Sequence, residues 1–325
     1  MNATSVTPAL SVVLTTPDAY ETIRTTVSHL RAQTIVEQLE LVVVAPARAS
    51  LAFPAEVEAE FGRLEVVELG AVLSIGAANA AGIRRASAPI VALVETHSFP
   101  QKEWAAALVA AHQGSWAAVG PRMLNANPID AVSWASFLVA YGRWAATTAA
   151  GPTDDVPGHN SSYKRTALLS FDADLERLME TETVLHWALR AKGHELYFEP
   201  RAETSHINPT RLSSCLSEVF HYQRIFGALR SSSWSRTRRA LYSASAPVIV
   251  ARRFARLTKQ LSEVRPPGVR RSSILSVAVV VLATATLGEV LGSLRGAGDA
   301  AGKKMGVEFH RREHLKKSDR SWPAD

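Results

Sequence analysis

The sequence predicts an α/β protein in which a mostly parallel central sheet is flanked by helices and followed by a helical C-terminal tail. Two observations support this fold class. Short apolar runs alternate with helical patterns between about residues 10 and 200, which is the spacing of strand–helix–strand units. A hydrophobic content of 47% over 325 residues is also enough for a large core. The chain is therefore expected to be globular.

The predicted strands of the first half are apolar runs rich in β-branched residues and closed by turn residues. They cover residues 10–14, 39–44, 64–69 and 90–94. The segments between them predict helices over 19–33 and 55–61, and a third through 83–86 that follows Gly76 and Asn79. Asp18 lies in the turn before the first helix and is expected to cap it.

The second half continues with longer connections. We expect helices at 101–112, 166–169 and 182–192, and strands at 116–119 and 195–198. Residues 129–150 are interpreted as helical or irregular, and residues 151–160 form a loop rich in Gly, Pro and Asp. His206 is predicted to lie in a polar turn after the last strand.

Two side chains that can bind a metal follow directly on the predicted strand 90–94. In an open α/β sheet, ligands bind outside the carboxyl ends of the strands, and Glu95 and His97 lie at such an end. In an extended backbone these two residues share one face and can grip one ion. An acidic residue and a histidine after a strand are also common in a solvated loop, so the spacing alone leaves both interpretations open.

The charge is distributed unevenly. The net charge of +6 favours an acidic partner, and basic residues crowd the segments 235–240, 251–259, 269–273 and 309–317. Aromatic residues are not interleaved with them as in a single-strand binder, so an anionic membrane surface is favoured over nucleic acid as the partner.

The ends and the cysteine content add two expectations about location. Residues 1–9 lack a basic region before an apolar core, so we predict no signal peptide. The single cysteine, Cys215, excludes an internal disulfide and fits a reducing compartment.

The tail contains two segments that predict contact with a membrane. Residues 236–261 interleave basic and apolar positions like an amphipathic helix that is broken near Pro247. Residues 274–287 form an uncharged run that is shorter than the roughly 20 residues of a bilayer span, and Glu289 lies inside any longer span. An interfacial or re-entrant segment, one transmembrane helix and a buried core helix all remain open.

Four segments in order resemble the family 2 glycosyltransferases, which have the GT-A fold. They are SVVLTTPDAYETIRTTVSHLRAQT, SIGAANAAGIRRASAPIVALVETHSFPQKEW, VPGHNSSYKRTAL and ETETVLHWALRAKGHELYFEPRAETSH. The resemblance covers about residues 10–210. It implies a catalytic domain over 1–210. Beyond it, the composition predicts a basic amphipathic helical region over 211–265 and a hydrophobic, membrane-inserted or buried segment with a basic end over 266–325.

The resemblance implies a divalent cation and a catalytic base. Glu95 and His97 stand where the family has Asp-x-Asp, and His206 stands where the family often completes the metal site. This carboxylate and imidazole pair favours Mn²⁺ over Mg²⁺. Glu182 is the implied general base, and Glu180 is its alternative because a shift of two residues exchanges them.

The resemblance also implies residues that contact the donor and the acceptor. They are Thr15, Pro17, Asp18, Asn79, Arg84, Gly158, His159 and Asn160. The acidic pair with which the family recognises the base of the nucleotide is replaced by residues 45–48, Ala-Pro-Ala-Arg. The identity of the donor nucleotide therefore does not follow from the sequence.

The implied activity is inverting transfer of a sugar from a nucleotide diphosphate donor to a lipid-linked or polysaccharide acceptor at the cytoplasmic face of the cell membrane. The altered metal motif and the missing acidic pair favour an alternative hypothesis, a glycosyltransferase-like binding or scaffold subunit without catalysis.

Overall fold

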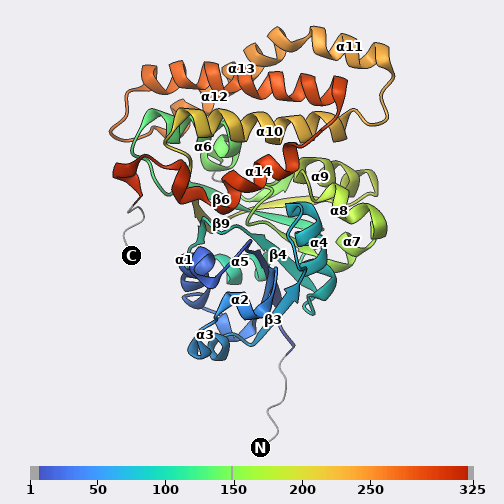
Figure 1. Ribbon diagram of the computed structural model, residues 1–325, viewed down its shortest axis with the longest axis vertical. Coiled ribbons are helices and arrows are strands. Elements are labelled where there is room, and N and C mark those ends of the chain that lie inside the picture. The colour runs from blue at the N-terminus through green and yellow to red at the C-terminus, as the bar shows by residue number, and fades with distance from the viewer. Residues whose placement is uncertain (1–6, 148, 321–325) are drawn as a thin grey trace, which may run out of the picture. The chain divides into compact units, whose positions relative to one another are not determined.

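The structure is a computed structural model that describes residues 7–147 and 149–320 (Figure 1). Residues 1–6 of the segment predicted to lack a signal peptide, and residues 321–325 of the basic end, lie outside the described residues. The chain forms two compact units. One consists of residues 1–122 and 148–205, and the other of residues 123–147 and 206–325.

A single sheet contains the predicted strands, within the part of the chain that the structure describes. Its order is β3–β2–β1–β4–β8–β6–β9–β5, with β7 paired to β9. The strands are β1 (Leu10–Thr15), β2 (Leu39–Ala45), β3 (Arg63–Glu68), β4 (Ile90–Val94), β5 (Ser98–Pro100), β6 (Ala118–Asn125), β7 (Gly151–Thr153), β8 (Ser162–Lys164) and β9 (Leu196–His206). The α/β fold class is thus confirmed.

The sheet contains both parallel and antiparallel pairs, whereas a mostly parallel sheet was predicted. Strands β1 to β4 are parallel, as the strand–helix–strand spacing predicts, and Leu10 of β1 stands between Leu39 and Ile90. Strand β8 pairs antiparallel with both β4 and β6. The short β8 carries no periodic signal of its own, because it occupies only three residues.

Helices cover both faces of the parallel strands. They are α1 (Tyr20–Arg31), α2 (Arg48–Leu51), α3 (Ala55–Glu60), α4 (Ile75–Arg85), α5 (Trp104–Ala111), α7 (Arg165–Leu169), α8 (Leu175–Leu178) and α9 (Glu182–Ala191). Leu10, Val12 and Leu14 of β1 pack with α1 and α5, whereas Val13 packs with α4. This alternation is the period of two of a strand buried on both faces.

Strand β9 corrects one prediction about the site. His206 was predicted in a polar turn after a strand ending at Phe198, but it is the last residue of β9 and only 3% exposed. Pro200 suggests a strand end, because proline cannot donate to a ladder. The alternating burial nevertheless continues after it, with Ala202, Thr204 and His206 buried.

The second unit is helical. It contains α6 (Ala131–Ala146), α10 (Leu212–Arg230), α11 (Arg236–Ala244), α12 (Ala246–Val264), α13 (Arg271–Arg295) and α14 (Ala300–Phe309). The side chain of Asp130 caps α6 by accepting from the amides of Val132 and Ser133. The break predicted near Pro247 lies between α11 and α12, and the uncharged run 274–287 is part of the much longer α13.

Helix α13 is, among the described residues, the one helix that is long and apolar enough to cross a membrane. Its buried side packs on α6, α10 and α12, and Ile274, Ala278 and Leu282 belong to the core of the helical unit. Of its most apolar 18 residues, 44% are buried. Length and composition therefore do not by themselves make α13 a membrane span.

Candidate functional site

The turn after β4 is held in place by a threonine of α1. Thr26 is fully buried, and its hydroxyl lies 3.2, 3.0 and 3.2 Å from the carbonyl oxygens of Glu95, Thr96 and Ser98. The Ser98 hydroxyl in turn donates to Oε2 of Glu95 at 2.9 Å. These bonds orient the Glu95 carboxylate and keep His97 beside it. Thr26 was not predicted, since a buried threonine has no sequence signal of its own.

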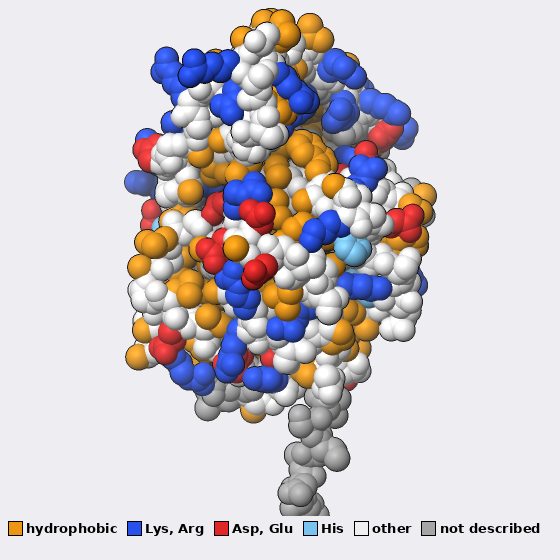
Figure 2. All heavy atoms as spheres, turned by 90° about the vertical axis from the view of Figure 1, so that its right-hand side faces the viewer, with side chains coloured by type: hydrophobic (Ala, Val, Ile, Leu, Met, Phe, Trp, Pro, Cys, Tyr) orange, Lys and Arg blue, Asp and Glu red, His pale blue; other side chains and the backbone are white. Residues whose placement is uncertain are grey.

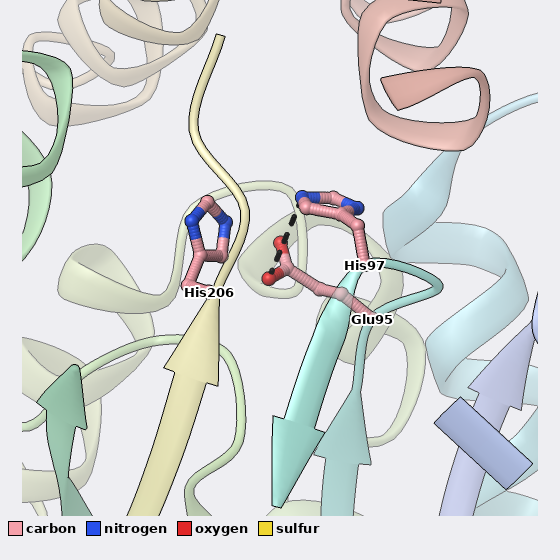
Figure 3. A group of neighbouring side chains, drawn as sticks. All are labelled: Glu95, His97 and His206. Atoms are coloured by element: carbon pink, nitrogen blue, oxygen red, sulfur yellow. Dashed lines mark ion pairs between the residues drawn. The ribbon is translucent and has the colours of Figure 1, made fainter. Parts of the chain in front are cut away.

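Glu95, His97 and His206 form a cluster in which a metal ligand atom from each residue lies within 4.8 Å of the others (Figure 3). Nε2 of His97 is 3.9 Å from Oε2 of Glu95. Nδ1 of His206 lies 3.1 Å from the side-chain oxygen of Asn208. This bond assigns the proton of His206 to Nδ1, so Nε2 carries the lone pair that a metal needs.

The donor set of this cluster fits a divalent cation. One carboxylate and two imidazoles suit a first-row metal such as Mn²⁺ better than Mg²⁺, which takes oxygen ligands. Two ligand atoms on one such ion stand roughly 3–4.2 Å apart for bonds of about 2.1 Å. The observed spacing requires only a small closure. The sequence-predicted metal ligands are therefore brought together.

The loop 155–160 lies next to the Glu95 turn and is tied to β4. The amide of Asn160 donates to the carbonyl of Leu93, and its own carbonyl accepts from Nε1 of Trp104 at 3.1 Å. Asn160 has a φ of 64°, a left-handed conformation that asparagine tolerates better than most residues. Both polar atoms of its side chain are buried without a hydrogen-bond partner. A buried amide of this kind points to a ligand.

His159 lies between the two acidic residues of the site. Its Nδ1 is 3.2 Å from Oε1 of Glu95, and its Nε2 is 3.5 Å from Oε1 of Glu182. The predicted metal ligand, loop histidine and catalytic base are thus consecutive neighbours. All three side chains are largely buried, with exposures of 10%, 12% and 2%.

The structure distinguishes Glu182 from Glu180. Glu182 is the first residue of α9, and its carboxylate lies so close to Gly158 that a Cβ on that glycine would be 2.6 Å from it. A Cβ on Gly76, at the start of α4, would instead meet the carboxylate of Glu180 at 2.7 Å. Of the two candidate bases, only Glu182 is in the group with His159 and Glu95.

Glu182 is nearly fully buried, and neither of its carboxylate oxygens has a hydrogen-bond partner. Its contact with His159 is an ion-pair distance without hydrogen-bond geometry. A buried carboxylate left in this state costs free energy, because it has lost its water without replacement. Thr181 beside it also has a buried hydroxyl without a hydrogen-bond partner.

A buried histidine joins the loop 155–160 to β8 through two hydrogen bonds, and we call Asp155, His186 and Tyr163 the histidine relay. Nδ1 of His186 is 2.5 Å from Oδ1 of Asp155, and Nε2 of His186 is 2.9 Å from the hydroxyl of Tyr163. His186 lies one turn after Glu182 on α9. The relay was not predicted. Its three residues come from separate segments of the chain, so no spacing in the sequence could have pointed to it.

Four of the residues predicted to contact the donor differ in burial. Thr15, at the end of β1, has a buried hydroxyl without a hydrogen-bond partner, and Asn79 is buried in α4. Pro17 is partly buried, and Asp18 is exposed. Asp18 accepts from the amide of Ala19 and the hydroxyl of Thr22, at 2.7 and 2.6 Å, rather than from the α1 amides that a capping side chain serves.

Arg84 does not join the site. It forms an ion pair with Glu176 at 2.7 Å, and its carbonyl accepts from Arg165. The amide of Arg165 bonds to the carbonyl of Pro89, just before β4 begins. Arg84 therefore lies at the edge of the sheet where β4 starts, whereas Glu95 follows the end of β4.

Comparison with known proteins gives structural similarities only. No family model matches the chain, and no curated protein matches it. A crystal structure of GalNAc-T7 with UDP, GalNAc and Mn²⁺ matches with a TM-score of 0.49 and 15% identity, over 62% of this chain and 43% of that chain. The chain therefore spans less than half of the length of GalNAc-T7.

Two structures of S. aureus TarS also match at 15% identity. The structure of residues 1–349 in complex with UDP has a TM-score of 0.45 and covers 84% of this chain and 89% of that chain. The other has a TM-score of 0.43 and covers 87% of this chain and 54% of that chain.

Proposed function

We propose that this protein is a metal-dependent glycosyltransferase that moves a sugar from a nucleotide diphosphate donor to a lipid-linked or polysaccharide acceptor, with inversion at the anomeric carbon. The proposal rests on the four sequence segments that resemble family 2 glycosyltransferases and on the residues that the structure groups around Glu182. One observation carries it. The buried Glu182 carboxylate has no hydrogen-bond partner, and it lies next to His159, which in turn lies next to Glu95.

Glu95, His97 and His206 are the residues that would hold the cation. When bound, a divalent cation would neutralise the negative charge that develops on the leaving nucleoside diphosphate. Mn²⁺ is the favoured ion because two of the three ligands are imidazoles.

Glu182 is assigned as the general base. Its carboxylate takes the proton of the acceptor hydroxyl, the hydroxyl oxygen forms a bond to the anomeric carbon, and the bond from that carbon to the donor phosphate breaks. His159 and Asn160 are assigned to orient the two substrates beside this carboxylate.

A donor screen tests the proposal. Thermal shift is measured for the wild type against a panel of nucleotide sugars with Mn²⁺ and with Mg²⁺. We expect at least one donor to raise Tm in a metal-dependent manner, since binding to the folded state alone stabilises it. His97→Ala should abolish that shift.

Two results would separate the alternatives. A donor that binds the wild type and His97→Ala equally, without turnover, would favour the glycosyltransferase-like binding subunit. Absence of binding and of turnover across the whole panel would refute the proposed transfer.

A further inference from the structure

One side of helix α13 is apolar and exposed along most of its length. Its exposed positions 276, 279, 280, 283, 287 and 294 recur at helical spacing, so they share one side. The large side chains among them are Val279 and Val280, each 45% exposed, Leu287, 61% exposed, and Leu294, 50% exposed. The helix has one acidic residue, Glu289, which is buried on the other side. We call these six positions the α13 stripe.

The opposite side of α13 is fixed by close packing on α10. A Cβ on Gly292 would lie 2.0 Å from the carbonyl oxygen of Arg224, and a Cβ on Gly227 would lie 2.1 Å from that of Glu289. Such contacts bring the two backbones together and leave no room for lipid between the helices. The α13 stripe is therefore the side that remains available to a partner.

Glu289 fixes α13 to the other helices of the same unit. Its Oε1 accepts from Arg230 of α10 at 3.0 Å and from the hydroxyl of Tyr242 at 2.5 Å. Its Oε2 accepts from Arg253 of α12 at 2.6 Å. A helix crossing a bilayer alone would have to break these bonds or carry the charged groups into hydrocarbon.

Exposed basic residues occur on the helices that contact α13 and at its two ends. Helices α11 and α12 pack against α13 and expose the arginines 236, 238, 252 and 256, while Arg271 and Arg295 are exposed at the two ends of α13. Residues 206–325 contain 21 lysines and arginines against 8 acidic residues. Figure 2 shows that blue Lys and Arg side chains and orange hydrophobic ones lie near one another on the face that it draws.

We propose that the α13 stripe docks on an anionic lipid surface, with α13 lying in the plane of the interface rather than crossing the bilayer. An amphipathic surface with an apolar strip and flanking arginines is the composition that binds such interfaces. A second copy of the chain fits less well, because self-association through the stripe would bring the flanking arginines of both copies together. The length of α13, roughly 37 Å at 1.5 Å per residue, does not decide the matter, since it suits either orientation.

Vesicle flotation of the full chain tests the docking. We expect binding to vesicles of phosphatidylcholine with phosphatidylglycerol, weak binding to pure phosphatidylcholine, and release at high salt. Val280→Asp with Leu287→Asp should reduce binding at least tenfold. Arg252→Ala and Arg256→Ala should each reduce it about fivefold.

Leu73→Asp is the matched control, because Leu73 is 77% exposed but lies outside the helical unit. Its vesicle binding should equal that of the wild type. All variants should retain the Tm of the wild type, since they alter exposed side chains. The assay contains no sugar donor, so its outcome is independent of the proposed transferase activity.

Labels at the two ends of the stripe distinguish docking from crossing. On a Cys215→Ser background, Ser276→Cys and Leu294→Cys are each labelled with a fluorophore that dithionite quenches. We expect dithionite added outside the vesicles to quench both labels. Protection of one label would show a transmembrane helix and overturn the proposal.

Two further outcomes would also overturn it. One is failure of the wild type to bind anionic vesicles. The other is a lipid-free dimer, seen by sedimentation, that dissociates in the Val280→Asp/Leu287→Asp variant, because it would assign the stripe to a second copy.

Discussion

The two units of this protein each bury a glutamate, but they treat it in opposite ways. Glu289 of the helical unit is fully buried and accepts hydrogen bonds from Arg230, Arg253 and Tyr242. Glu182 of the sheet unit is 1% exposed, and its oxygens have no hydrogen-bond partner. A buried charge whose hydrogen bonds are all made holds the surrounding side chains in one arrangement. A buried charge without hydrogen bonds lowers the stability of the fold, so its presence needs a reason other than folding. The contrast assigns Glu289 to stability and supports the proposed role of Glu182 as the base.

The largest expected effect on stability is at Glu289. Glu289→Gln removes the charge that Arg230 and Arg253 face, so the free energy of unfolding should fall by about 3 kcal/mol. Urea unfolding measures it. Glu182→Gln is the matched variant and should leave the free energy of unfolding within about 1 kcal/mol of the wild type or raise it, because the amide removes a costly buried charge. If both variants lost the same free energy of unfolding, the two glutamates would not differ in their contribution to stability.

A second test uses a buried histidine of the sheet unit. Burial lowers the pKa of His112 to about 4, with a further contribution from Lys164. The unfolded chain binds this proton near pH 6.5, so the folded state binds fewer protons between the two values, and stability falls as the pH drops from about 6.5 towards 4. At about pH 5 the loss due to His112 should be about 2 kcal/mol.

The control is His112→Gln, whose side chain can still reach Ser162, the partner of His112 at 2.9 Å. Its free energy of unfolding should lose about 2 kcal/mol less than that of the wild type between pH 7.5 and about pH 5. An identical pH dependence in both proteins would show that His112 does not titrate between these pH values.

A smaller effect is expected at the relay below the loop 155–160. His186→Asn shortens the side chain that joins Asp155 to Tyr163, so it should cost about 1.5 kcal/mol of stability through lost buried hydrogen bonds. Guanidinium unfolding measures this cost. Tyr163→Phe removes only the hydroxyl and should cost less. A larger cost for Tyr163→Phe would contradict the assignment of His186 as the centre of the relay.

The smallest effect is expected at Arg84, which the structure places outside the site. Its ion pair with Glu176 is exposed on both sides, so Arg84→Ala should change stability by less than about 0.5 kcal/mol. The Tm shift caused by a donor with Mn²⁺ should equal that of the wild type. Loss of that Tm shift in Arg84→Ala would show that Arg84 takes part in donor binding.

The sequence predicts the parallel strands from periodicity, and chain order places Glu95 and His97 at the end of one of them. His206 was expected beside them only from the family resemblance. The continuous apolar runs of β1, β2 and β4 are buried on both faces, and Glu95 and His97 follow the last of them. The family resemblance implied Glu182 as the base with Glu180 as its alternative, and the sequence could not show which carboxylate lies near the loop 155–160. In the structure it is Glu182 that lies against Gly158.

Other features depend on contacts between distant residues. The bonds of Thr26 to the Glu95 turn and of His186 to Asp155 join segments that the sequence does not relate. Helix α10 lies within the basic amphipathic helical region expected over 211–265, but its close packing on α13 was not predicted. Gly227, Gly288 and Gly292, where the two backbones meet, give no sequence signal of a contact between distant helices. Glu289 was expected to disfavour a bilayer span that includes it, and in the structure arginines from two neighbouring helices pair with it.

The most direct test of Glu182 as the base is the rate of nucleoside diphosphate release from the donor found in the screen, with Mn²⁺ and an acceptor present. We predict that Glu182→Gln lowers kcat about 10³-fold with the donor Tm shift unchanged, and that Glu180→Gln retains most activity. Turnover by Glu182→Gln at the rate of the wild type would contradict the account.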